Sequence, residues 1–174
     1  GDVRNKKSLQ ETLSSFQPQI IFHLAAQSLV RKSYENPIQT FEINSMGTLN
    51  LLDCLRDPTS IIAAVIITSD KCYENVEWLW GYRENDRLGG KDPYSASKAC
   101  AEVISKVYME SFYKKKGPAI ATTRAGNVIG GGDWALDRIV PDCVRAWSKG
   151  NKVLIRNPDA TRPWQHVLEP LSGY

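Results

Sequence analysis

Three runs of apolar residues constrain the fold of this chain more than any other feature. Residues 20–26 are apolar without a regular alternation, which is typical of a parallel strand buried on both faces. Residues 61–67 repeat this pattern, and residues 119–125 provide a third strand. Helical patterns separate the three runs. Strands that alternate with helices predict an α/β fold built on a doubly wound parallel sheet.

A capping box predicts the first helix. Ser8 and Glu11 have the spacing at which each side chain satisfies a backbone amide of the first turn. Leu9 and Leu13 then follow on one face of an amphipathic helix, and Pro18 ends it.

A longer helix is predicted over residues 37–56, with a proline at its first position and Asp57-Pro58 after its end. Gly47 inside this helix costs about 1 kcal/mol relative to alanine, so we expect close packing there. Asn44 is either a solvated polar residue or a strut that hydrogen-bonds the strand ends. The inward-facing residues are Phe41, Thr48, Leu51, Leu52 and Leu55.

The helix that Asp92-Pro93 opens carries Tyr94 and Lys98. Residues four apart lie on the same helix face, so the ammonium can stabilise the phenolate form of the tyrosine. The pair predicts a tyrosine base, although such spacing also arises in solvated helices. The same helix has a wide apolar face, which predicts a partner helix. Its members are Ala96, Ala99, Cys100, Val103, Ile104, Val107, Tyr108 and Phe112.

A second polar cluster follows the apolar run 61–67 directly. Thr68, Ser69, Asp70 and Lys71 supply two hydroxyls, a carboxylate and an amine. In open parallel sheets, ligands bind beyond the carboxyl ends of the strands. We therefore expect this cluster and the Tyr94 helix to meet at one site.

Composition excludes several classes of protein. The 174 residues carry a net charge of +3, with 42% hydrophobic and 24% charged residues, which is ordinary for a globular domain and favours neither nucleic acid nor membrane as a partner. The four cysteines have no metal-ligand spacing, so no metal is expected. Free thiols and the absence of a long apolar stretch predict a cytoplasmic location. Neither end has a natural start or stop signal, which predicts a fragment.

The remaining segments give weaker predictions. His23 is interpreted as a hydrogen-bonded core histidine. Residues 73–92 form a loop whose tryptophans either line a ligand site or bury a subunit contact. The three glycines at 130–132 predict a mobile turn, a helix is expected over residues 141–149, and residues 153–155 predict a short strand. Arg156 and Arg162 on a loop have the chemistry to bind a diphosphate, although arginines on loops are more often simply solvated.

Several motifs together resemble the extended short-chain dehydrogenase/reductases. Those shared with the whole family lie at residues 1–4, 23–27, 44–48, 68–71, 94–98 and 124–127. Three further stretches, at residues 69–75, 125–134 and 161–167, are similar to those of the CDP-glucose 4,6-dehydratases. The resemblance covers nearly the whole chain, and it implies a Rossmann-like fold, an NAD cofactor and a role in deoxysugar biosynthesis for lipopolysaccharide O-antigen.

The resemblance also implies a reaction. Tyr94 takes the proton of the sugar 4-hydroxyl, Lys98 lowers the pKa of Tyr94 and holds the nicotinamide ribose, and Ser69 hydrogen-bonds the same hydroxyl. Water is then eliminated across C5 and C6. In related dTDP-glucose dehydratases an Asp and a Glu perform this step, and the matching residues here are Asp70 and Lys71. A lysine acts as the base only if its pKa is lowered.

Ligand-binding positions follow from the same resemblance. The cofactor positions are Asp2, Leu24, Ala25, Ala26, Tyr94 and Lys98. The substrate positions, for CDP-glucose, are Gln27, Asn127 and Arg162. Residues 1–150 correspond to part of an NAD-binding domain and residues 151–174 to the start of a nucleotide-sugar lobe. A homodimer through the helices near residues 37–56 and 94–113 is also implied.

One family feature is absent from this sequence. The glycine-rich first βα turn that binds the NAD pyrophosphate does not occur, so we expect the chain by itself to bind NAD weakly or not at all. Two alternatives remain open. A nucleotide-sugar 4-epimerase shares the Tyr94 and Lys98 pair but has no need of Asp70 and Lys71. A non-catalytic structural fragment has no reason to keep the tyrosine, the lysine, Ser69 and Asp70 together.

Overall fold

The computed structural model describes residues 1–56 and 60–174. These form two compact units, residues 1–125 and 126–174. The division of function at residues 150 and 151 stays a prediction. The helices and helical turns of the first unit are α1 (Lys6–Phe16), α2 (Val30–Glu35), α3 (Pro37–Phe41), η1 (Glu42–Met46), α4 (Gly47–Cys54), η2 (Asp70–Cys72), α5 (Pro93–Tyr108) and η3 (Met109–Tyr113).

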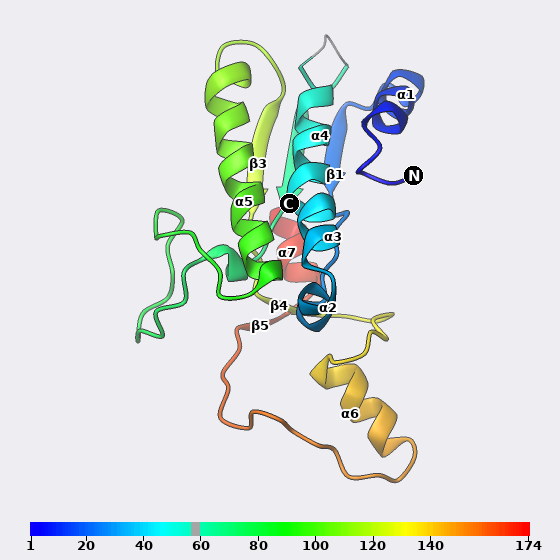
Figure 1. The fold of residues 1–174 in the computed structure, drawn as a ribbon, viewed down its shortest axis with the longest axis vertical. Coiled ribbons are helices and arrows are strands. Elements are labelled where there is room, and N and C mark those ends of the chain that lie inside the picture. Colours follow the sequence, from blue (N-terminus) through cyan, green and yellow to red (C-terminus); the bar gives the residue numbers. More distant parts are fainter. Residues whose placement is uncertain (57–59) are drawn as a thin grey trace. The chain divides into compact units, whose positions relative to one another are not determined.

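The first unit is built on a three-stranded parallel sheet in the order β1 (Ile20–His23), β2 (Ala63–Ile67) and β3 (Ala119–Thr123) (Figure 1). Each strand matches one of the apolar runs, and the predicted α/β fold is confirmed. The strands are shorter than predicted. Residues 24–26 have already left the sheet, and the polar cluster 68–71 follows the last residue of β2.

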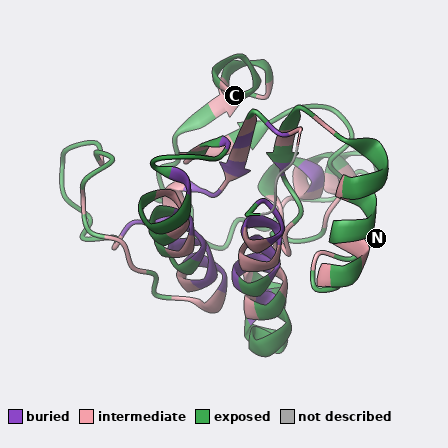
Figure 2. Cartoon of the chain, turned by 90° about the horizontal axis from the view of Figure 1, so that it is seen from above, coloured by how far each residue is buried: buried purple, intermediate pink, exposed green. Residues whose placement is uncertain are grey.

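The sheet is buried on one face within this chain, so the prediction that residues 20–26 are buried on both faces is wrong. Ile21, Ala64 and Ile66 point into a core with leucines of α1 and α4. Ile20 and Phe22 alternate with Ile21 and are 56% and 51% exposed. The physical reason is that α1, α4 and α5 contribute their apolar side chains to the same core, on one face of the sheet (Figure 2).

Local polar residues start the helices, but not always the predicted ones. The capping box prediction is wrong, because α1 begins at Lys6 and the Asn5 side chain accepts the hydrogen bond from the amide of Ser8. Because Asn5 occupies the N-cap position, Ser8 lies within the first turn of the helix. The predicted start at Asn36-Pro37 is confirmed, with the proline in the first turn of α3.

The segments α3, η1 and α4 follow one another without a break over residues 37–54, which matches the predicted helix except at its end. Asp57 and Pro58, which were expected to follow that end, lie outside the described residues. Close packing at Gly47 is confirmed, since a Cβ there would lie 2.6 Å from the Val3 Cγ2 atom. The π-helical segment η1 was not predicted, and it contains the buried Asn44.

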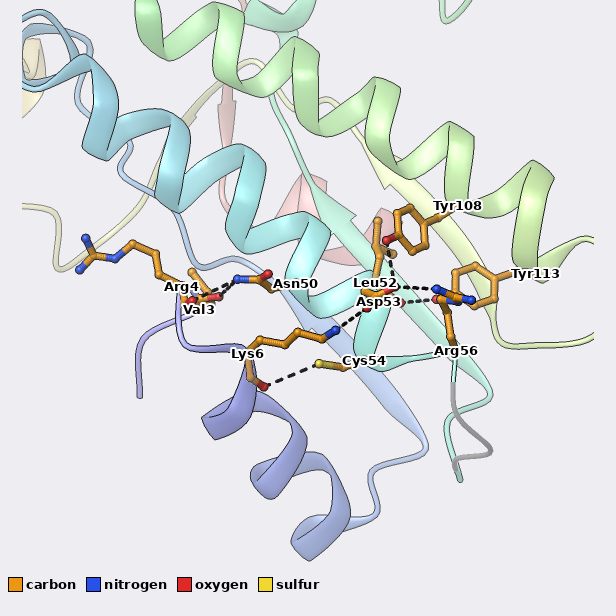
Figure 3. Close-up of polar contacts among 10 residues, drawn as sticks. All are labelled: Val3, Arg4, Lys6, Asn50, Leu52, Asp53, Cys54, Arg56, Tyr108 and Tyr113. Atoms are coloured by element: carbon orange, nitrogen blue, oxygen red, sulfur yellow. Dashed lines mark hydrogen bonds and ion pairs between the residues drawn. The ribbon is translucent and has the colours of Figure 1, made fainter.

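A polar cluster joins α1, α4 and α5 (Figure 3). Asp53 on α4 accepts hydrogen bonds from Lys6 (2.5 Å), Arg56 (3.1 Å) and the Tyr108 hydroxyl (3.1 Å). The Lys6 side chain is the main cause that holds the pKa of Asp53 down, at about 2. The cluster therefore links the N-terminal helix to the two central helices of the unit.

The second unit has a small parallel pair of strands, β4 (Asn127–Ile129) and β5 (Trp164–His166), with helices α6 (Ile139–Trp147) and α7 (Leu168–Gly173). The prediction of a strand at residues 153–155 is wrong. Within the described residues no strand pairs with this run, and Leu154 is 88% exposed. Of the mobile turn predicted at residues 130–132, the turn is confirmed at residues 131 and 132, with Gly132 at φ 86°, and its mobility stays a prediction. The helix predicted over residues 141–149 is α6, shifted by two residues.

None of the helices among residues 1–56 and 60–174 combines the length and apolar composition that a membrane span requires.

Candidate functional site

Tyr94 and Lys98 lie in the first turns of α5. Asp92 caps this helix, accepting a hydrogen bond from the amide of Ser95 (2.9 Å), and Pro93 follows at the first position. The two side chains are 8% and 7% exposed. They are therefore buried on the inward face of the helix and do not form the solvated pair that chance spacing usually gives.

The Lys98 ammonium reaches the carboxyl end of β2. Its Nζ atom donates a hydrogen bond to the carbonyl of Ile67 (3.0 Å), the last residue of that strand. Burial lowers the pKa of Lys98 to about 8, and the carboxylate of Glu102 acts in the opposite direction. A helix residue and a strand end that are 31 positions apart in the sequence are thus brought together.

Ser69, Asp70 and Lys71 occupy the turn that follows β2, as predicted. The Ser69 hydroxyl donates to Asp70 Oδ1 (3.0 Å), and Ser69 Oγ accepts from the amide of Lys71 (3.3 Å). Helix α5 packs directly on this turn. The amide of Asp70 donates to the carbonyl of Ala125 (3.1 Å), which fixes the turn to the chain beyond β3.

Asn44 is the strut that one of the two interpretations predicted. Its side chain accepts from the amide of Gln27 (2.8 Å) and donates both to the carbonyl of Gln27 (3.0 Å) and to Ser97 Oγ (2.9 Å). Ser97 in turn donates to the carbonyl of Tyr94 (2.7 Å). The residues after β1 are therefore locked to the start of α5 by a buried amide.

Gln27 and His23 flank residues 24–26, the predicted cofactor positions after β1. The Gln27 side chain donates to Thr40 Oγ1 (3.1 Å) and to the carbonyl of Leu29 (3.1 Å), so its amide is engaged within the chain, and its role in substrate binding stays a prediction. His23 is a core histidine, as predicted: it is 7% exposed and lies 3.2 Å from Thr48 Oγ1. Burial, followed by the charge of Lys98, lowers the pKa of His23 to about 4.

Residues 73–92 connect the end of η2 to the start of α5. Apart from one isolated bridge between Tyr73 and Leu88, this stretch has no strand pairing among the described residues. It returns so closely that a Cβ on Gly90 would lie 2.4 Å from the amide nitrogen of Ala96. A glycine at this position is therefore required by the backbone of α5, next to Tyr94.

The sequence did not indicate two buried polar residues of the site, Ser33 and Glu102. Ser33 on α2 is fully buried and accepts a hydrogen bond from the amide of Tyr94 (3.1 Å). Glu102, one turn after Lys98, is 4% exposed and pairs with Arg124 (2.8 Å). The signal available for Glu102 was its helical spacing, which places a carboxylate on the face that Tyr94 and Lys98 share.

Three further predicted positions are Asp2, Asn127 and Arg162. Asp2 near the N-terminus is exposed and forms an ion pair with Arg4 (2.6 Å); the hydrogen bonds from Arg4 lower the pKa of Asp2 to about 2. Asn127 and Arg162 belong to the second unit. The side-chain oxygen of Asn127 is buried and has no hydrogen-bond partner among the described residues. Arg162 is exposed and donates to the carbonyl of Thr161 (2.6 Å).

A parallel α/β sheet, with a buried Tyr94 and Lys98 pair and a Ser69-Asp70-Lys71 turn at its strand ends, defines a protein of the short-chain dehydrogenase/reductase class. A family model described as GDP-mannose 4,6 dehydratase matches residues 1–173. The chain belongs to this family of sugar-nucleotide dehydratases and their relatives.

Individual relatives agree with this family. Over 179 aligned residues the chain is 54% identical to the CDP-glucose 4,6-dehydratase of Salmonella typhimurium, covering 100% of this chain and 50% of that protein. The solved structure of DesIV, the dTDP-glucose 4,6-dehydratase of Streptomyces venezuelae with NAD bound, has a TM-score of 0.87 at 25% identity, covering 99% of this chain and 51% of that one. The UDP-glucose 4-epimerase of Thermus thermophilus, in complex with NAD, has a TM-score of 0.86 at 27% identity, covering 99% and 57%. The chain thus spans about half the length of these relatives.

Proposed function

We propose that the protein containing this chain is an NAD-dependent nucleotide-sugar 4,6-dehydratase, a hydro-lyase that converts CDP-glucose to CDP-4-keto-6-deoxyglucose. The observation that carries this proposal is the hydrogen bond from Lys98 Nζ to the carbonyl of Ile67. It places a buried ammonium next to the Ser69-Asp70-Lys71 turn and one helical turn from Tyr94. The 54% identity to a protein named CDP-glucose 4,6-dehydratase supports the choice of substrate.

Two features of the site fit an NAD cofactor. An ammonium has three donors, and the described residues supply Lys98 Nζ with one acceptor, which leaves donors for ribose hydroxyls. Beyond β1, the exposed Leu24 and Ala25 leave the backbone accessible to a flat ligand. We assign Leu24, Ala25 and Ala26 to the dinucleotide, and Asp2 to its adenosine end. When bound, NAD would accept the hydride from C4 of the sugar and return it to C6 after water has left, so that the overall reaction needs no external oxidant or reductant.

We assign the first proton transfer to Tyr94. Its phenolate accepts the proton of the sugar 4-hydroxyl, while the Ser69 hydroxyl hydrogen-bonds the same oxygen. Lys98 stabilises the phenolate by its charge, and burial strengthens that interaction because little water screens it. The three groups come from two segments that the Lys98 to Ile67 hydrogen bond holds together.

We assign the elimination of water to Asp70 and Lys71. Once C4 is a ketone, the proton on C5 is acidic. In our proposal the neutral amine form of Lys71 removes this proton, while the protonated carboxylic acid form of Asp70 gives its proton to the oxygen that leaves C6 as water. Both residues lie on the turn η2, and the hydrogen bond from Ser69 orients the Asp70 carboxylate. The acid and the base are thereby held next to the hydroxyl that serves the first step.

The second unit supplies candidate groups for the nucleotide end of the substrate. Asn127 has a buried side-chain oxygen without a partner among the described residues, and such an atom fits a ligand donor. Arg162 is an exposed guanidinium suited to a diphosphate. We assign both residues to nucleotide-sugar binding.

We also propose a homodimer through the helices near residues 37–56 and 94–113. Both helices keep apolar side chains on their outer faces, including Met46 (49% exposed), Val103 (52%), Val107 (51%) and Phe112 (42%). Apolar helix faces of this kind pack well against a second copy. The free thiols fit a reducing, cytoplasmic compartment, where we place the enzyme in deoxysugar synthesis for lipopolysaccharide O-antigen.

The test uses the complete polypeptide encoded by the open reading frame that contains this chain. Incubated with CDP-glucose, it is expected to form a keto sugar, which is detected by its absorbance in base. Tyr94→Phe is expected to abolish product formation and to leave the fold intact. An epimeric CDP-sugar without a keto product would identify a 4-epimerase instead, and the absence of turnover with any nucleotide-activated glucose would refute the proposal.

A further inference from the structure

The buried carboxylate of Glu102 connects three elements of the first unit. Its oxygens accept hydrogen bonds from the Thr68 hydroxyl, from the Thr122 hydroxyl (2.9 Å) and from the Arg124 guanidinium (2.8 Å). Thr68 follows β2, Thr122 and Arg124 come from β3 and its end, and Glu102 lies on α5. The hydrogen bonds from Arg124 and Thr68 outweigh the effect of burial and lower the pKa of Glu102, so the carboxylate is charged at neutral pH.

Arg124 extends this connection to the loop of residues 73–92. Its second terminal nitrogen donates to the carbonyl of Glu84 (2.9 Å), and its guanidinium carbon lies 4.8 Å from the centre of the Tyr73 ring. The Tyr73 ring stacks in turn on Tyr82, with centroids 5.1 Å apart. One arginine therefore holds the base of the loop and the helix at once.

The two ends of the Ser69-Asp70-Lys71 segment are both tied to this ion pair. Thr68 immediately precedes the segment and donates to Glu102, while Tyr73 lies just after it against Arg124. On α5, Glu102 is one turn from Lys98 and two turns from Tyr94. The ion pair thus joins the segment that carries the proposed acid and base to the helix that carries the proposed tyrosine base.

A buried ion pair is a weak source of stability, because removing two charges from water offsets their attraction. Its geometry is more informative than its energy. Arg124 uses both terminal nitrogens and one face of its guanidinium, and these contacts cannot be reproduced together by an ammonium. Such an arrangement defines a position more sharply than apolar side chains of similar size would.

We propose that Glu102 and Arg124 are positioning residues of the dehydratase reaction, and that they hold the Ser69-Asp70-Lys71 segment in register with Tyr94 and Lys98. Neither residue needs to touch the substrate. This inference rests on the proposed function, since it concerns the alignment of groups that act on the same sugar.

The test measures kcat and KM for CDP-glucose with the complete polypeptide and two variants. Arg124→Lys keeps the charge opposite Glu102 and loses the contacts to Glu84 and Tyr73. Since Arg124→Met alone would leave a charged carboxylate buried, the second variant is the double substitution Glu102→Gln/Arg124→Met, in which glutamine retains an oxygen for the threonine donors. The matched control is Glu11→Gln, which removes an exposed ion pair with Lys7 on α1, outside both the site and the proposed dimer helices.

Misplacing reacting groups by an ångström costs about 100-fold in rate, so the double variant is expected to lose about that factor in kcat while KM changes by less than about twofold. Arg124→Lys is expected to lose about tenfold in kcat, intermediate between native enzyme and double variant. The control retains native kinetics. Rates are expressed per folded site, which is counted by circular dichroism and bound NAD.

An Arg124→Lys enzyme with native kcat would overturn the proposal, whether or not the double variant folds. So would a double variant in which only stability or KM changed, since a purely structural ion pair predicts that pattern. Failure of the native protein to turn over CDP-glucose would instead refute the proposed function, so the two failures are distinguishable.

Discussion

Replacing Lys98 by methionine tests the electrostatics of the site most directly. Lys98 is 7% exposed, and burial lowers its pKa from the ordinary 10.5 to about 8. A tenfold change in an acid dissociation constant corresponds to about 1.36 kcal/mol, so keeping this ammonium charged in the folded protein at pH 7 costs about 3 kcal/mol of folding free energy. The variant removes this cost and loses one hydrogen bond to Ile67, worth about 1 kcal/mol.

Lys98→Met is therefore expected to stabilise the NAD-free protein by about 2 kcal/mol at pH 7 while it abolishes turnover. The pH dependence gives the sharper test. Between the folded pKa of about 8 and the unfolded pKa of 10.5, the unfolded chain binds more protons than the folded one, so the native protein gains stability as the pH rises. The difference in unfolding free energy between Lys98→Met and the native protein should therefore fall to near zero at about pH 10.

Urea denaturation of both proteins between pH 7 and about pH 10 measures this difference, and groups that titrate in both proteins cancel. Lys106→Met, an exposed position on the same helix, is the control and should change stability little at any pH. A Lys98→Met protein that was less stable at pH 7, or whose stability difference did not change with pH, would refute the reasoning.

Three further predictions concern Gly90, Asp53 and the cofactor. Gly90→Ala places a Cβ against the backbone of Ala96, so it should displace the start of α5 and lower kcat about 100-fold, with a change in near-ultraviolet circular dichroism; native kinetics would contradict this. Asp53→Asn should destabilise the protein at pH 7 by about 1 kcal/mol after allowance for the exposure of its partners Lys6 (43%) and Arg56 (48%). Because folding lowers the pKa of Asp53 from 3.8 to about 2, the difference should shrink as the pH falls from about 4 towards 2, and a constant difference in urea denaturation would exclude this cause. The 174-residue chain by itself, which has no glycine-rich first turn, should bind NAD weakly or not at all by calorimetry, and micromolar binding would disprove this.

Sequence patterns were reliable where short-range physics decides the outcome. The apolar runs predicted all three strands of the main sheet, because a strand that enters a core must be apolar whatever its neighbours are. The shared helix face of Tyr94 and Lys98 and the position of Ser69 just after β2 were also predicted correctly, because both follow from local spacing; the chemical roles of these residues stay predictions. Gly47 was rightly linked to close packing, since glycine is unfavourable inside a helix unless a neighbouring segment approaches too closely for a Cβ.

The errors arose where a residue's role depends on distant partners. The run at residues 153–155 has the composition of a strand, but a strand also needs a neighbour, and β5 is the strand that pairs with β4. Ser8 was predicted as the cap because its spacing to Glu11 fits a capping box. Asn5, three residues earlier, is an equally suitable cap, and it is the residue that caps α1 in the structure. The exposed face of β1 could not be inferred from its composition, because the side of the sheet that the helices cover is a property of the assembled unit.

The sequence by itself determined the α/β fold, the family and the two segments that carry the candidate catalytic residues. These properties depend on local composition and on fixed spacing between residues. Only the tertiary structure decided how those segments are held in register. Lys98 meets Ile67, Asn44 meets Ser97 and Glu102 meets Arg124 across 22 to 53 positions of sequence. Such contacts exist only after the chain has folded, and no local pattern specifies which of many polar side chains will meet.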